Sequence, residues 1–142
     1  MRFLFLLGVV LAGCATPPAP EPAPTEAPAP PPPLTARESI AVAGLMESAR
    51  AETAAGNVAS AAASLERALR IEPRNPRLWH ELARVRLKQG QYAQVESVAA
   101  RSNSWAGEDR ALRAENWRLI AQSREARGDA EGAKAALELS TR

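Results

Sequence analysis

The stretch PRLWHELARVRLKQGQYAQVESVAA, residues 76–100, decides the fold of this chain. Its first half places apolar side chains at Leu78, Leu82 and Val85, which is the spacing of one face of an α-helix. The pair Gly90-Gln91 then interrupts the pattern, because glycine readily adopts the backbone conformation of a tight turn. Apolar residues resume four positions apart after this turn. The stretch therefore predicts two short helices joined by a turn.

The same pattern occurs three times along the chain. Its turns lie at the Gly-polar pairs Gly56-Asn57, Gly90-Gln91 and Gly128-Asp129. The first two turns are 34 residues apart, and the next gap is 38. Large apolar residues precede the three glycines by eleven positions: Leu45, Trp79 and Trp117. Small or apolar residues follow each glycine by five and nine positions: Ala61, Val95 and Ala133, then Leu65, Ala99 and Leu137.

A 34-residue helix-turn-helix period with this spacing resembles the tetratricopeptide repeat. The resemblance implies an all-α fold in which three repeats stack into a short right-handed solenoid. We expect the repeats at about 42–75, 76–109 and 114–142. The four extra residues behind the 38-residue gap are expected at Arg101–Asp109. A composition rich in alanine, leucine, arginine and glutamate also favours helix.

Helix starts are marked by capping residues. Asn75 precedes Pro76, which suits the first position of a helix because its missing N–H has no helical partner there. Asn57 and Asp129 are placed to cap the second helices of the first and third repeats. Thr35 and Glu38 have the spacing of a capping box at the start of the first helix.

The N-terminus predicts export and a lipid anchor. Arg2, an apolar run and the small residues before Cys14 follow the order of a secretory signal. The run is too short to span a membrane, which takes about 20 residues. The sequence around Cys14 resembles the lipobox of bacterial lipoproteins, which implies cleavage after Gly13 and acylation of the cysteine. We therefore expect a signal peptide at 1–13, a lipidated tether at 14–36 and a folded domain at 37–142.

The tether is defined by proline. Residues 17–33 hold ten of the twelve prolines, which exclude helix and sheet pairing. An extended polyproline-II spacer of this length reaches at most about 50 Å. A ligand for a proline-binding domain is the alternative. Ala15 follows the lipidated position in place of the aspartate that retains many Gram-negative lipoproteins in the inner membrane. By that resemblance the protein faces the periplasm from the outer membrane.

Catalysis has little support in the sequence. One histidine, one cysteine that is expected to be acylated and no glycine-rich phosphate loop leave no recognisable catalytic group. His80 alone does not make a metal site. The small net charge of +2 gives no indication of nucleic acid as a partner. We therefore predict a protein that is not an enzyme, with no cofactor, metal or small-molecule substrate.

Partner binding is expected on the concave groove, which the first helix of each repeat lines in this family. The groove positions map to Met46, Arg50, Arg77, His80, Arg84, Lys88, Arg118 and Gln122. Arginine forks in such a groove would hold an acidic peptide or a C-terminal carboxylate. The alternative is a solvated face that keeps the helical array soluble.

Trp105 differs from the other two tryptophans in its sequence context. Trp79 and Trp117 occupy the bulky core position of their repeats, whereas Trp105 lies in the polar segment 102–107, which we expect to be non-helical. An exposed Trp105 would be an interface anchor, since tryptophan is enriched at binding hot spots. The alternative is that it folds back over the helix ends.

The layout as a whole resembles small tetratricopeptide outer-membrane lipoproteins that activate bifunctional, class A penicillin-binding proteins. This resemblance implies a periplasmic protein partner and a role in peptidoglycan synthesis. The alternative is a scaffold or assembly factor for an outer-membrane, pilus or secretion complex.

Overall fold

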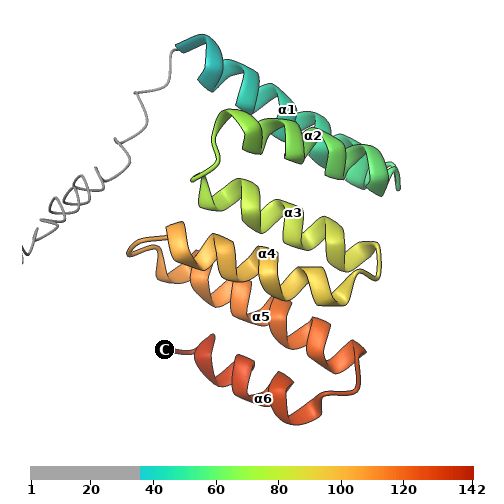
Figure 1. Ribbon diagram of the computed structural model, residues 1–142, viewed down its shortest axis with the longest axis vertical. Coiled ribbons are helices and arrows are strands. Elements are labelled where there is room, and N and C mark those ends of the chain that lie inside the picture. The colour runs from blue at the N-terminus through green and yellow to red at the C-terminus, as the bar shows by residue number, and fades with distance from the viewer. Residues whose placement is uncertain (1–35) are drawn as a thin grey trace, which may run out of the picture. The chain divides into compact units, whose positions relative to one another are not determined.

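The computed structural model describes residues 36–142 (Figure 1). The signal peptide, Cys14, the tether and Thr35 lie outside the described residues. Six helices and no strand make up the described part: α1 (Ala36–Ala54), α2 (Val58–Ile71), α3 (Pro76–Lys88), α4 (Tyr92–Trp105), α5 (Arg110–Ala126) and α6 (Ala130–Leu139). They form the pairs α1–α2, α3–α4 and α5–α6, which stack in chain order. The predicted all-α fold of three helix-turn-helix repeats is confirmed.

Local chemistry explains most of the helix boundaries. The Oδ1 of Asn75 accepts hydrogen bonds from the N–H groups of Arg77 and Leu78, at 3.0 and 3.4 Å. Asp129 caps α6 by accepting from the N–H of Gly132 at 2.9 Å. Both predicted caps are confirmed. Asn57 precedes α2 but makes no side-chain capping bond, so that prediction is wrong. Gly90 turns the chain with φ +71°, a conformation that is strained for residues with a Cβ.

Helix lengths show where the third repeat departs from the period. α2 and α4 each have 14 residues, and α4 starts 34 positions after α2. α5 also starts 34 positions after α3, but it has 17 residues where α3 has 13. The extra residues therefore form an additional turn within α5, and their predicted placement at Arg101–Asp109 is wrong. α5 begins at Arg110, before the predicted repeat boundary at 114.

Two clusters of buried side chains hold the repeats together. The cluster formed by α1, α2 and α3 contains leucine and valine beside alanine: Val42, Ala49, Ala61, Ala62, Leu65, Ala68, Leu69, Leu78, Leu82 and Val85. The cluster between the second and third repeats consists of Ala83, Ala99, Ile120, Ala121, Ala133 and Ala136. The first cluster therefore buries more aliphatic carbon than the second, and such burial is the main stabilising term.

Leu137 departs from its repeat position. The equivalent residues Leu65 and Ala99 are buried, but Leu137 is 51% exposed. Leu65 and Ala99 are each covered by the next repeat, and no described helix follows α6. None of the described helices is long and apolar enough to cross a membrane.

The different burial of Leu78 and Leu137 predicts different losses of stability when each is replaced by alanine. Leu78→Ala should lower the free energy of unfolding by about 2–5 kcal/mol, because it leaves a cavity at a fully buried position. Leu137→Ala is the matched control and should cost less than about 1 kcal/mol. Urea denaturation followed by circular dichroism measures both. Equal losses in the two variants would contradict the assignment of the core.

Candidate partner-binding groove

A hollow of about 260 Å³ lies between α1 and α3. Its lining consists of Met46, Ala49, Arg50, Thr53, Ala54, Leu65, Glu81, Arg84, Val85 and Lys88. Four residues that the sequence placed in the groove meet here: Met46 and Arg50 from α1, and Arg84 and Lys88 from α3. The floor is apolar, with Leu65 and Val85 buried beneath the charged side chains. We call this hollow the α1–α3 groove.

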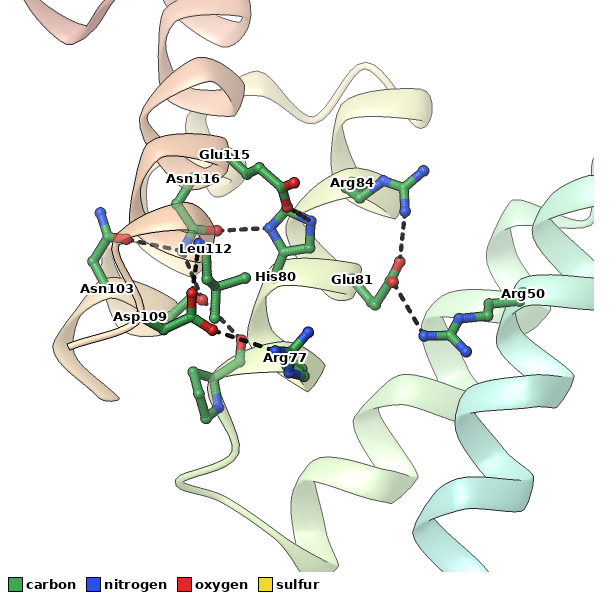
Figure 2. A network of polar contacts seen from close by, with 12 residues as sticks. Arg50, Arg77, His80, Glu81, Arg84, Asn103, Asp109, Leu112, Glu115 and Asn116 are labelled. Carbon is green, nitrogen blue, oxygen red and sulfur yellow. Dashed lines mark hydrogen bonds and ion pairs between the residues drawn. The ribbon is translucent and has the colours of Figure 1, made fainter. Parts of the chain in front are cut away.

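Glu81 stands between two arginines of the α1–α3 groove (Figure 2). One carboxylate oxygen lies 3.7 Å from Nη2 of Arg50, and the other accepts a hydrogen bond from Nη1 of Arg84 at 3.1 Å. The Glu81 side chain is 19% exposed, whereas the side chains of both arginines are about half exposed. Glu81 therefore holds the two guanidinium groups close together and leaves some of their N–H donors open to solvent. Three cations and one acid give the lining a net charge of +2.

The linear sequence indicates only one of the two ion pairs that Glu81 makes. Glu81 and Arg84 have the i,i+3 spacing of neighbours on one helix face, but nothing in the linear pattern indicates Arg50. Glu66 and Arg70 have the i,i+4 spacing of a helical pair, yet Glu66 accepts its hydrogen bond from Arg86 of α3. Such contacts between repeats depend on how the helices stack, so helical spacing within one element does not reveal them.

Arg77 and His80 lie outside the α1–α3 groove, toward α5. Nη2 of Arg77 is 3.3 Å from Oδ2 of Asp109, the residue that caps α5 through the N–H of Leu112. His80 is buried, with its Nδ1 2.8 Å from Oδ1 of Asn116. Its Nε2 lies 3.5 Å from a Glu115 carboxylate oxygen. Both residues therefore join the second repeat to the third.

Asn116 is the centre of a buried polar network that the sequence analysis did not detect (Figure 2). Its Nδ2 donates to the Ser102 hydroxyl at 2.7 Å and to Oδ1 of Asn103 at 2.8 Å. Ser102 in turn donates to the carbonyl of Pro76 at 2.8 Å. We name Asn116, His80, Ser102 and Asn103 the Asn116 network. Because Asn116 uses its oxygen as the acceptor, this network assigns the donor hydrogen of His80 to Nδ1.

The position of Asn116 in its repeat does indicate a buried polar contact. It stands twelve residues before its turn glycine, where the second repeat has the fully buried Leu78. A polar residue at an apolar core position requires hydrogen-bond partners in the interior. Residues of α3 and α4 supply them here.

Arg118 and Gln122 are exposed on α5 and do not line the α1–α3 groove. Neither has a polar side-chain partner within residues 36–142. In that same part of the chain, no cluster of acidic, histidine or cysteine side chains has the arrangement of a metal site.

Trp105 is the last residue of α4, so the expectation of a non-helical segment is wrong. The residue is 39% exposed, and the guanidinium carbon of Arg74 lies 5.1 Å from the centroid of its ring. Arg101 lies over Trp79 in the same way, at 5.4 Å. The indole N–H of Trp79 donates to the carbonyl of Pro73 at 2.8 Å. Guanidinium groups thus cover part of both rings, and Trp105 stays accessible at its edge.

Removal of Asn116 should weaken the junction between the second and third repeats. Asn116→Ala leaves buried partners without hydrogen bonds and should lower the free energy of unfolding by about 1–3 kcal/mol. Asn57→Ala is the control, since Asn57 is exposed and makes no capping bond. It should cost less than about 0.5 kcal/mol. Thermal or urea unfolding gives both values, and a neutral Asn116→Ala would refute the structural role of the network.

Comparisons with known proteins agree with this geometry. The tetratricopeptide repeat family model matches residues 52–122, half of the chain. The solved structure of the globular C-terminal domain of P. aeruginosa LpoP is 46% identical in sequence, with a TM-score of 0.70. That match covers 71% of this chain and 95% of the LpoP domain chain. No curated protein sequence matches the chain. The chain therefore belongs to the tetratricopeptide repeat family, and its folded part is similar to the LpoP C-terminal domain.

Proposed function

We propose that this protein is an outer-membrane-anchored lipoprotein that binds a periplasmic protein through the α1–α3 groove and activates it. The partner we propose is a class A penicillin-binding protein, which would place the chain in peptidoglycan synthesis. Tetratricopeptide repeats are protein-interaction modules, and the similarity to the LpoP C-terminal domain supports the narrower assignment. The observation that carries the proposal is the basic groove over an apolar floor.

The chemistry of the α1–α3 groove suits an acidic segment of the partner. Arg50 and Arg84 present planar forks that match carboxylates, and Glu81 holds both in place before binding. Pre-positioned side chains lose less conformational entropy when a ligand binds. Lys88 adds a cation that has no polar partner among the described residues. Met46 and Val85 provide apolar contact beside these charges.

Trp105 is proposed as a second contact. Exposed tryptophan and arginine side chains are enriched at the energetic centres of protein interfaces. Arg74 and Trp105 form such a pair next to the loop between the first and second repeats. A partner that covers both sites would contact two different faces of the second repeat.

Charge reversal in the α1–α3 groove tests the binding site. Arg84→Glu combined with Lys88→Glu should weaken binding to the synthase at least about tenfold, because acidic groups then oppose acidic groups. The control is Arg67→Glu with Arg70→Glu, on exposed α2 positions outside the groove. Glycan polymerisation by the class A synthase, with and without each variant, measures the effect. Equal stimulation by all variants would exclude the groove.

The partner itself is tested by crosslinking in cell envelopes. Photoreactive residues at Arg84 and at Trp105 should each capture the penicillin-binding protein. Capture of outer-membrane, pilus or secretion components without any synthase would instead support a scaffold.

The anchor is tested at Cys14. Cys14→Ala removes the residue that would be acylated, and an unlipidated chain has no comparable membrane affinity. The variant is expected to move from the outer-membrane fraction to the soluble periplasmic fraction, or to remain unprocessed. Membrane fractionation with immunoblotting measures this shift. Unchanged outer-membrane association of a processed Cys14→Ala chain would contradict a lipid anchor.

A further inference from the structure

A second, separate hollow lies between the start of α5 and the end of α6. Its volume is about 500 Å³, within the range of sites that hold small ligands or a few peptide side chains. The lining consists of Arg110, Ala111, Arg113, Ala114, Trp117, Leu139, Ser140, Thr141 and Arg142. None of these residues belongs to the α1–α3 groove. We call it the α5–α6 hollow.

The extra turn of α5 builds one wall of this hollow. Counted back from the turn glycine, α5 begins four residues earlier than α3 does in its repeat. Arg110, Ala111 and Arg113 belong to these four extra residues. Arg110, Arg113 and Trp117 follow each other at three- and four-residue spacing, so they share one face of the helix. The third repeat thus has a surface that the first two lack.

The charges of the α5–α6 hollow are unbalanced. Its lining contains three arginines and no acidic side chain. Arg110 and Arg113 have no side-chain polar partner within residues 36–142, whereas Arg77, Arg86, Arg124 and Arg127 each have an acidic partner. The nearby Asp109 is already engaged by Arg77 and by the N–H of Leu112. Two guanidinium groups one turn apart are therefore available to anionic groups.

Apolar and acceptor groups accompany these cations. Trp117 and Leu139 present apolar surface in the same hollow, and Leu139 is 37% exposed. The hydroxyls of Ser140 and Thr141 donate to the carbonyls of Leu137 and Glu138. Ser140 is buried, but the lone pairs of the exposed Thr141 hydroxyl remain as acceptors for an external N–H. A simple anion would use the arginines but leave the apolar surface and these acceptors without a partner.

We propose that the α5–α6 hollow binds an acidic peptide segment of a protein partner, with an apolar side chain next to its carboxylates. Arg110 and Arg113 take the carboxylates, and the apolar side chain lies against Trp117 and Leu139. A backbone N–H group of the peptide reaches the hydroxyl of the exposed Thr141. This surface lies outside the α1–α3 groove and would give the domain a second point of attachment.

The test uses the unlipidated mature chain, residues 14–142 with Cys14→Ser, and an acetylated Glu-Glu-Leu-Glu peptide amide as the probe. The indole N–H signal of Trp117 in ¹⁵N-edited NMR spectra should shift in a saturable manner. Arg110→Gln combined with Arg113→Gln should weaken this binding at least about tenfold, because two charge-assisted contacts are lost. Arg67→Gln with Arg70→Gln is the matched control and should leave the affinity unchanged.

Three results would overturn the proposal. The first is equal binding of a Gln-Gln-Leu-Gln peptide, and the second is an unchanged Trp117 shift in the Arg110→Gln, Arg113→Gln variant. The third is an equal Trp117 shift caused by inorganic phosphate or phosphatidylglycerol vesicles. Arg84→Gln combined with Lys88→Gln separates this site from the α1–α3 groove. That variant should still show the Trp117 shift, whether or not the groove binds the synthase.

Discussion

Close contact between helices at small side chains is the constraint on which this structure depends. Seven residues before each turn glycine stand Ala49, Ala83 and Ala121, and all three are buried. Five residues after each glycine stand the buried Ala61, Val95 and Ala133. A larger side chain at these positions would push apart two helices whose remaining contacts are also close-packed. Since each helix pair is stabilised by its neighbours, such a change would extend beyond its own repeat.

The two junctions between repeats are built by different means. Leucine and valine fill the first one, while the second combines an alanine-rich cluster with the Asn116 network. Hydrogen bonds specify how α3, α4 and α5 meet, but their net stabilisation is modest. Nδ2 of Asn103 is buried and has no hydrogen-bond partner among the described residues, which adds a cost. The Asn116 network therefore specifies how the third repeat is placed on the second.

Ion pairs between helices, and not the net charge of the chain, decide where basic surface remains exposed. Glu81 gathers Arg50 and Arg84 in the α1–α3 groove, and Glu96 engages Arg124 and Arg127 at the opposite end of α5 from Arg110. Arg110 and Arg113 remain without such acids. The chain as a whole carries a net charge of +2, yet the groove and the α5–α6 hollow are distinctly basic. Two basic surfaces on separate helices suit a partner that attaches at more than one point.

The sequence by itself determined the helices, their pairing and the repeat family. Apolar spacing, turn glycines and the Asn75-Pro76 cap act within one or two turns of chain, so their signals are local. The resemblance to the tetratricopeptide repeat, whose first helices line the groove, placed Met46, Arg50, Arg84 and Lys88 together. Tertiary structure alone decided that Glu81 joins two repeats, that Asn116 replaces a core leucine with a network, and that the extra residues lengthen α5. These features depend on the distance and rotation between stacked helices, which no single helix encodes in its own spacing.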